Sequence, residues 1–358
     1  MVIVPAHDEE HLIARCIASL LRQTYPRELY QVLVVSDNCS DGTASIAEAA
    51  GVDVMVRDEP DAPGKGRALR WAADQLLSSR DAPDALVVVD ADSVADPNLL
   101  SALESEFRRG HPVVQADYTV LIDDSSSRRN QLVAAGFLLF HRVRFSGRAR
   151  LGMSANLVGN GMLFSRAVLM ANPWSAFTGV EDLEYSISLR LAGVPITFAP
   201  GAFVSGPGPA TRASEVRQRL RWEGGRFHVV RTRLAEIVGA AMRQRDLRLL
   251  DAALDLATPP LGLLTTAVAA GFMGAAIAIA LGIAPAWSVL PWLVALGAIP
   301  AFVVIGLKAA GAPSTVWTAV LGAPFFLGGK LFTYVSLARG FDPNRWDRTD
   351  RAIARTGR

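Results

Sequence analysis

The feature that most constrains the fold of this chain is a long segment, residues 258–337, that is almost free of charge. Lys308 and Lys330 carry the only charged side chains in it, although 20% of the 358 residues of the chain are charged. The chain is 51% apolar, and the apolar excess is concentrated in this segment. Residues 1–250 have the composition of an ordinary α/β domain. The segment must therefore be buried, either in a lipid bilayer or in a protein core.

Three stretches of the segment are long and apolar. A helix that crosses a bilayer needs about 20 mostly apolar residues, and residues 261–283 and 287–307 meet this requirement, with Pro285 in the turn between them. The third stretch, 314–337, carries Lys330 in its interior, and a lysine at the bilayer centre costs about 2.5–3.5 kcal/mol on insertion scales. We predict that the first two stretches cross the membrane and that the third is a transmembrane or interfacial helix.

Arginines are concentrated on both sides of the apolar segment, over residues 231–248 and 339–358. Basic residues beside apolar spans mark the cytoplasmic side of a membrane. Two cytoplasmic flanks require an even number of spans, which favours two spans and an interfacial third helix whose Lys330 reaches the headgroups. The alternatives are two solvated basic faces for the flanks and buried core helices for the apolar stretches. The length of the stretches disfavours core helices.

The start of the chain and its cysteines fit a catalytic part that stays in the cytoplasm. Met1 runs directly into an apolar strand without a secretory signal. Cys16 and Cys39 are too far apart for a disulfide framework or the spacing of a metal site. We expect a multi-pass protein of the inner (cytoplasmic) membrane with a cytoplasmic catalytic domain, and no nucleic-acid partner.

Short β-branched runs alternate with helical patterns over the first 120 residues. This alternation predicts a parallel sheet covered by helices on both faces. In such sheets the ligand lies outside the carboxyl ends of the strands. The predicted strands are residues 2–4, 32–35, 52–56 and 86–89, and the predicted helices are residues 10–21, 43–50 and 66–77.

Carboxylates follow three of these strands directly. Clustered carboxylates repel one another, and a divalent cation or the donors of a ligand usually compensate. Each group also has a structural explanation, because Asp41 can close a turn and cap a helix, and Asp8 or Glu9 can face a helix dipole. The carboxylates in question are Asp8, Glu9, Asp37, Asp41, Asp90 and Asp92.

A series of motifs in a fixed order resembles the large family of inverting glycosyltransferases that includes cellulose, hyaluronan and chitin synthases and ceramide glucosyltransferase. The combination of D-x-D, E-D and Q-x-x-R-W is the specific part of this resemblance. His7, Asp8 and Val180 depart from the family's usual residues, which puts fine specificity in doubt. The motifs are IVPAHDEE at 3–10, VSDNCSDGT at 35–43, GKGRAL at 64–69, DAD at 90–92, GNG at 159–161, VED at 180–182, QRLRW at 218–222 and WDRTDR at 346–351.

The resemblance implies a GT-A-like nucleotide-sugar-binding α/β fold, with a mixed, mainly parallel sheet, followed by transmembrane or interfacial helices. We expect a cytoplasmic glycosyltransferase domain over residues 1–235 and a basic, amphipathic linker helix over 236–257. The membrane region would cover 258–337 and a basic cytoplasmic tail 338–358.

The resemblance also implies roles for single residues on the donor side. The loop after the first strand and Asp37 would hold the nucleoside, while Lys65 and Arg67 would lie near the phosphates, unless they form a solvated basic loop. Asp90 and Asp92 would bind Mg²⁺ or Mn²⁺ through oxygen. The donor-binding set is Pro5, His7, Glu9, Asp37, Lys65, Asp90 and Arg221.

On the acceptor side, the resemblance makes Asp182 the general base, with Glu181 as the second choice. Both acids could instead cap the helix that begins near residue 183. Gln218 and Trp222 share a helix face and would contact the acceptor, as would Gly161. The alternative for Trp222 is a lipid anchor on an interfacial helix.

These assignments predict a metal-dependent hexosyltransferase that works by single displacement. UDP-sugars are the usual donors in the resembled family, so the donor is expected to be a UDP-sugar. Two spans cannot enclose a polar polymer, which favours a lipid or lipid-linked acceptor over a free glycan. The alternatives are a polysaccharide synthase subunit acting as a homo-oligomer or with a partner export protein, a non-catalytic membrane scaffold, and a nucleotidyltransferase.

Overall fold

The computed structural model describes residues 1–122 and 126–322 of the chain. Lys330, most of the third apolar stretch and the basic tail with its WDRTDR motif lie outside the described residues.

The described residues contain one eight-stranded sheet, with the strand order β3-β2-β1-β4-β7-β6-β8-β5. β1 to β4 are mutually parallel, β7 runs antiparallel to β4 and β6, and β6 and β8 are parallel. The expected mixed, mainly parallel sheet is therefore confirmed. The strands are β1 (Val2–Ala6), β2 (Val32–Asp37), β3 (Asp53–Arg57), β4 (Ala85–Val88), β5 (Val94–Ala95), β6 (Val113–Val120), β7 (Met162–Ser165) and β8 (Thr197–Gly206).

Helices cover both faces of this sheet, as expected, because successive side chains of its strands point to opposite sides. Val2 and Val4 of β1 pack in a core with α1, α2 and α4, whereas Ile3 packs in a second core with α3, α7 and α8. The helices are α1 (Ile13–Leu21), α2 (Thr43–Ala49), α3 (Lys65–Leu77), α4 (Leu99–Arg108), α7 (Arg166–Ala171) and α8 (Glu181–Leu191).

The first predicted helix starts three residues later than expected, at Ile13 rather than residue 10. The reason is that the loop after β1 is hydrogen-bonded to the loop after β2. The Glu10 N–H donates to Asp41 Oδ2 at 3.0 Å, and the Gly42 N–H donates to Glu10 Oε2 at 2.9 Å. These bonds hold Glu10 in the loop and keep it out of α1.

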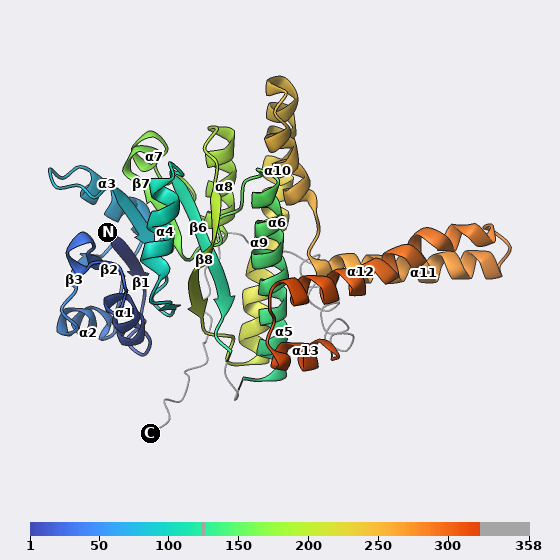
Figure 1. Ribbon diagram of the computed structural model, residues 1–358, viewed down its shortest axis with the longest axis horizontal. Coiled ribbons are helices and arrows are strands. Elements are labelled where there is room, and N and C mark those ends of the chain that lie inside the picture. The colour runs from blue at the N-terminus through green and yellow to red at the C-terminus, as the bar shows by residue number, and fades with distance from the viewer. Residues whose placement is uncertain (123–125, 323–358) are drawn as a thin grey trace.

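A layer of helices separates the sheet from the apolar segment (Figure 1). One long helical run consists of α5 (Arg128–Phe137), a π-helical segment (Leu138–Val143) and α6 (Arg144–Arg150). The second part of the layer is α9 (Arg212–Gln244), which turns at Arg245 in a left-handed conformation (φ 53°) into α10 (Leu247–Ala257). Figure 1 shows α9 and α10 running across the direction of the helices that follow.

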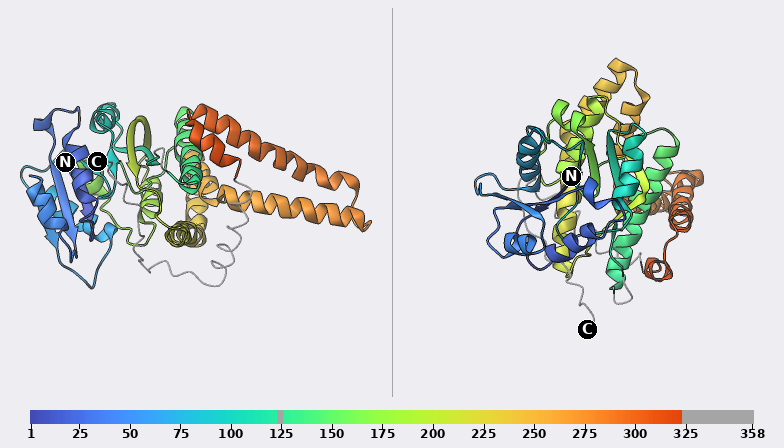
Figure 2. Two further views of the ribbon diagram at one scale, coloured as in Figure 1. Left: turned by 90° about the horizontal axis from the view of Figure 1, so that it is seen from below. Right: turned by 60° about the vertical axis from the view of Figure 1, so that its left-hand side comes forward.

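The apolar segment forms a helical hairpin that projects away from the sheet (Figures 1 and 2). It consists of α11 (Leu261–Ala280), a 3₁₀ turn (Ala286–Val289) and α12 (Leu290–Ala309). Two helical stretches, Leu261–Ala280 and Ala286–Ala309, are long and apolar enough to cross a membrane, and nearly all of their residues are exposed. Helices that are apolar all round and exposed are not core helices of a soluble protein, so the structure contradicts that alternative.

The described start of the third apolar stretch behaves differently from the hairpin. It forms α13 (Ser314–Val320), and its buried residues Val316 and Ala319 face inward. Val316 belongs to a cluster with Ala135 of α5 and Leu138 and Leu139 of the π-helical segment. This part of the stretch therefore packs on the helical layer.

Candidate active site

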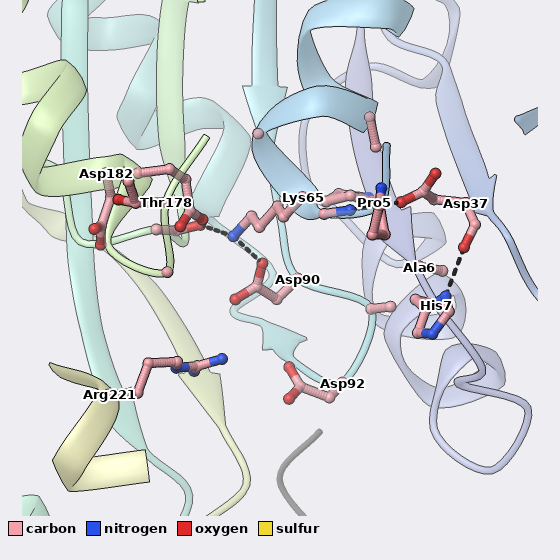
Figure 3. A pocket seen from close by; sticks show the side chains of 18 of the residues that line it. Pro5, Ala6, His7, Asp37, Lys65, Asp90, Asp92, Thr178, Asp182 and Arg221 are labelled. Carbon is pink, nitrogen blue, oxygen red and sulfur yellow. Dashed lines mark hydrogen bonds and ion pairs between the residues drawn. The ribbon is translucent and has the colours of Figure 1, made fainter. Parts of the chain in front are cut away.

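A cavity of about 290 Å³ lies at the carboxyl ends of β1, β2 and β4 (Figure 3). Its walls come from widely separated parts of the sequence, including the start of α8 and the first half of α9. It brings together nearly all of the predicted site residues, namely Pro5, His7, Glu9, Asp37, Lys65, Asp90, Asp92, Glu181, Asp182, Gln218, Arg221 and Trp222.

Gly161 is the exception among the predicted residues. It adopts a positive φ of 65°, and a Cβ atom there would lie 2.7 Å from Ala116 Cβ and 2.8 Å from Val204 Cγ1. Its N–H donates to the carbonyl of Val88 at 2.9 Å. The structure thus places Gly161 between packed strands and outside the cavity lining, apart from the other predicted site residues. Gly159 is the glycine of this segment that lines the cavity.

Asp37 is held rigidly at one end of the cavity. Its side chain is buried, and its Oδ1 accepts hydrogen bonds from Arg57 Nη1 at 2.5 Å and from Asn38 Nδ2 at 2.9 Å. Arg57, the last residue of β3, is itself buried and also pairs with Glu59. Sequence reasoning missed this arginine, although the register pairs it with Asp37 across β2 and β3. The pair fixes a carboxylate that can accept hydrogen bonds from a ligand.

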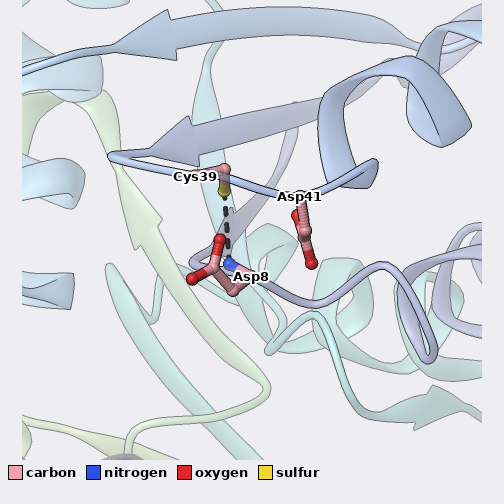
Figure 4. Close-up of side chains that lie close together, drawn as sticks. All are labelled: Asp8, Cys39 and Asp41. Atoms are coloured by element: carbon pink, nitrogen blue, oxygen red, sulfur yellow. Dashed lines mark hydrogen bonds between the residues drawn. The ribbon is translucent and has the colours of Figure 1, made fainter.

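The loops after β1 and β2 contain Asp8, Cys39 and Asp41, whose possible ligand atoms lie within 4.8 Å of one another (Figure 4). Local hydrogen bonds already engage these groups. Asp41 accepts from the N–H of Thr43 at 2.9 Å, Asp8 Oδ1 accepts from the N–H of Ser40 at 2.7 Å, and Cys39 Sγ accepts from the N–H of Asp8 at 3.3 Å. The explanation of Asp41 as a turn residue therefore holds, whereas the N-cap of α2 is Gly42. A thiol is also a poor ligand for a hard cation.

Lys65 spans the middle of the cavity (Figure 3). Its ammonium donates to Asp90 Oδ1 and to the carbonyl of Gly159. Burial works against the charged form of Lys65, but the carboxylates of Asp90 and Glu181 outweigh it and raise the pKa of Lys65 above its ordinary value. Lys65 is thus a fixed cation inside the site, and not part of a solvated basic loop. Arg67 does not line the cavity, because its guanidinium lies over the Phe177 ring at 5.0 Å.

Asp90 and Asp92 project into the cavity from the turn after β4. Asn160 holds this turn, because its Oδ1 accepts from the N–H of Asp90 at 3.2 Å and its Nδ2 donates to Ser93 Oγ at 2.7 Å. Two carboxylates one residue apart on one wall provide the oxygen donors that Mg²⁺ and Mn²⁺ prefer, so the residues present fit such a cation. Asn160 is a further residue that sequence reasoning missed.

Asp182 faces Asp90 from the far side of the cavity, in the first turn of α8 (Figure 3). Burial and, second, the neighbouring charge of Glu181 raise its pKa from 3.8 to about 7. The N–H of Leu183, which donates to Asp182 Oδ1 at 2.7 Å, opposes this rise, as do the charges of Lys65 and Arg221. A carboxyl group with a pKa near 7 suits a general base at neutral pH.

The third wall comes from one face of α9, which carries Gln218, Arg221 and Trp222. Arg221 points toward the space between Asp182 and Asp92 (Figure 3). The ring of Trp222 is 36% exposed and packs against Phe137 with ring centroids 5.8 Å apart. Trp222 therefore packs against α5 and also lines the cavity. Tyr118 of β6 also lines the cavity and was not foreseen from the sequence.

A family model described as glycosyltransferase like family 2 matches residues 1–225. The probable glycosyltransferase YdaM of Bacillus subtilis is 26% identical over 244 residues, which are 66% of this chain and 57% of that protein. The beta-monoglucosyldiacylglycerol synthase of Trichormus variabilis is 28% identical over 235 residues, which are 63% of this chain and 48% of that protein. The chain thus spans about half the length of these curated relatives.

Among solved structures, the chain is similar to the mannosyltransferase PcManGT of Pyrobaculum calidifontis, whose structure contains GDP-Man and Mn²⁺. The TM-score is 0.53 at 19% sequence identity, and the match covers 90% of this chain and 85% of that one. This likeness confirms the GT-A-like fold.

Proposed function

Since the chain belongs to the glycosyltransferase family 2-like family, we propose that it transfers a sugar from a nucleotide-sugar to a hydroxyl group of a lipid at a membrane surface. One observation carries this proposal. Asp90 and Asp92 line one wall of the cavity, Asp182 lines the opposite wall, and the cations of Lys65 and Arg221 lie between them.

The donor would lie along the sheet edge, with its nucleoside near Asp37 and its diphosphate near Lys65 and Arg221. A diphosphate needs positive partners, and these two side chains are cations that line the cavity. Asp90 and Asp92 would hold Mg²⁺ or Mn²⁺, which when bound would help to neutralise the charge of the departing nucleoside diphosphate. The donor of the Pyrobaculum enzyme structure is GDP-Man, so the base of the donor is left to experiment, with UDP as the first choice.

The transfer is a single displacement. The acceptor oxygen attacks the anomeric carbon and forms the new C–O bond while the bond from that carbon to the diphosphate oxygen breaks. The bonding electron pair leaves with the nucleoside diphosphate, and the hydroxyl proton passes to the carboxylate of Asp182. Because attack and departure occur on opposite faces, the anomeric configuration inverts. Glu181, which raises the pKa of Asp182, is the second candidate for the base.

The membrane and acceptor assignments rest on two supports. The hairpin of α11 and α12 has the length and composition of two membrane spans, which would put the cavity beside a bilayer. A relative of the chain is named a synthase of a glucosylated diacylglycerol. A lipid acceptor on the cytoplasmic face of the inner membrane is consistent with both and with the basic flanks of the apolar segment.

The test is a panel of nucleotide-sugars offered to the full chain in membrane extract, with nucleoside diphosphate release and the mass of lipid products as readouts. We expect release with one donor class, one added sugar on a lipid, loss of activity in chelator and recovery with Mg²⁺ or Mn²⁺. Asp92→Ala should not recover with either ion. Release of pyrophosphate would show a nucleotidyltransferase, a ladder of product lengths a polymer synthase, and no release with any donor would overturn the proposal.

A further inference from the structure

A second cavity, of about 770 Å³, lies between the helical layer and the base of the hairpin. Its walls come from α5 and the π-helical segment on one side and from α11 and α12 on the other. Most of its lining is aliphatic or aromatic, including Phe137, Phe140, Leu264, Val268, Ile299 and Phe302. The free energy of the system falls when an apolar group displaces water from such a surface.

This apolar cavity meets the candidate active site. Tyr118, Val158, Asp182 and Trp222 line both cavities. A molecule whose apolar part fills the second cavity can therefore place its head beside Asp182. At its other end, the cavity is lined by residues of both candidate membrane spans, so the site has one apolar side that faces the hairpin and one polar side that faces the donor.

Two arginines of the apolar cavity, Arg226 and Arg144, are engaged in protein contacts. Arg226 donates to the carbonyls of Asp255 at 2.5 Å, Leu256 at 3.0 Å and Thr258 at 2.9 Å. Arg144 pairs with Asp255 and lies over the Phe140 ring at 4.2 Å. These contacts leave a wall that suits an alkyl chain, whereas a sugar chain would lose hydrogen bonds there.

The groups near the junction favour an uncharged head over an anionic one. Glu223 lines the apolar cavity together with Asp182, and so do Arg144, Arg219 and Arg226. The three arginines already pair with Asp255, with Glu215 and with the Asp255 carbonyl, respectively, so a phosphate would meet two carboxylates beside cations that are already engaged. His141 contributes no positive charge at neutral pH, because burial lowers its pKa to about 4. A hydroxyl group, in contrast, can donate its proton to Asp182.

We infer that the apolar cavity binds the alkyl chain of the acceptor and that the acceptor is a neutral lipid bearing a hydroxyl group, admitted from the bilayer beside α11 and α12. The inference rests on the proposed function for the fate of the hydroxyl. The binding of the chain does not depend on turnover and is tested separately.

Two helical glycines offer a matched pair for the test. A Cβ atom meets nothing within 4 Å at Gly136 or at Gly147, so a side chain is accommodated at both. Gly136 lines the apolar cavity and Gly147 does not. Gly136→Phe should fill the cavity, and Gly147→Phe on the same helical run is the control. Ala298→Trp, at another lining position on α12, serves if Gly136→Phe does not fold.

The probe is a 16-carbon alcohol with a mid-chain diazirine and a terminal alkyne, photolysed with the full chain in nanodiscs. In the wild type we expect labelling of Val180, Leu183 and Leu132, which line the cavity. Gly136→Phe should lose this labelling, and Gly147→Phe should keep it. Labelling confined to α11 and α12, or unchanged in both cavity-filling variants, would overturn the inference. Stronger labelling of these positions by the matching alkyl phosphate would overturn the neutral head.

The failure of this inference is distinguishable from that of the proposed function. Release of nucleoside diphosphate from the donor is measured on the same preparations. If no donor is turned over while the cavity is labelled, the proposed reaction is wrong and the lipid site stands. If the donor is turned over and the cavity is not labelled, the lipid site alone is wrong.

Discussion

Replacing Glu181 by glutamine is expected to extend the activity of this protein to lower pH. Burial and the charge of Glu181 raise the pKa of Asp182 to about 7, and Asp182, as the proposed base, must be deprotonated to accept a proton. At pH 5, two units below this pKa, roughly 1% of a group with a pKa of 7 is deprotonated, so the rate should fall about 100-fold between pH 8 and pH 5. Glu181→Gln removes one of the two causes of the raised pKa, so the acid limb of the profile should move to lower pH.

The assay is kcat/KM for sugar transfer against pH, from pH 4.5 to 8.5, with the donor class found in the panel. Asp182→Asn should lower the rate by roughly 10²–10⁴ at every pH, the range typical of a lost general base. Asp74→Asn is the control, because this side chain on α3 is 57% exposed, pairs with Arg70 and does not line the cavity. An acid limb that Glu181→Gln does not move refutes the reasoning, and a loss of all activity in that variant would make Glu181 the base.

Thermal unfolding of the same variants checks the pKa independently of activity. The folded protein holds the pKa of Asp182 above its ordinary value of 3.8, so the native state favours the protonated form. Wild-type stability therefore falls as the pH rises from about 4 through about 7, relative to a variant that cannot ionise. The Tm of Asp182→Asn minus the Tm of the wild type should accordingly increase as the pH rises across this window. Parallel Tm curves would contradict the raised pKa.

Three further predictions concern stability and packing. Arg57→Ala should leave Asp37 buried without its cation and destabilise the fold by about 3–5 kcal/mol, as measured by urea unfolding; a loss below 1 kcal/mol would contradict the rigid pair. Gly161→Ala should destabilise by about 1–3 kcal/mol through overpacking against Ala116 without changing the KM for the acceptor, and a KM effect alone would restore an acceptor role. The carboxyl of Asp255 is buried, yet the arginines around it, led by Arg144, hold its pKa below its ordinary value. Its stabilisation should therefore be lost as the pH falls below about 4, and an acid-unfolding midpoint unchanged in Asp255→Asn would disprove this.

The individual strands and helices at the start of the chain could be predicted from the sequence. The apolar strand runs of the first 90 residues and the helices between them lie within a few residues of their predicted positions, because a parallel sheet buried on both faces requires continuous apolar strands. β6 and β8 were not predicted. They pair across about 80 residues with a register shift between Ala116 and Asp117, and nothing in the local pattern specifies such a distant partner.

The sequence predicted those site residues that directly follow a strand. Asp37, Asp90 and Asp92 line the cavity because carboxyl ends of neighbouring parallel strands meet at one edge. Residues that only support the site were missed. The pairing of Arg57 with Asp37 depends on strand register, and the hold of Asn160 on the turn after β4 depends on the packing of a loop 70 residues away. The choice between Gly159 and Gly161 needed backbone geometry that a Gly-Asn-Gly triplet does not encode.

The course of α9 and α10 across the direction of the hairpin has a kinetic consequence. With the hairpin in a bilayer, these helices lie along its surface and hold the reaction centre at one fixed height. The protein and the proposed lipid acceptor would then meet by diffusion in two dimensions. The acceptor supply is set by its mole fraction among the surrounding lipids, and diluting the sample with buffer leaves it unchanged, whereas adding inert lipid slows the reaction.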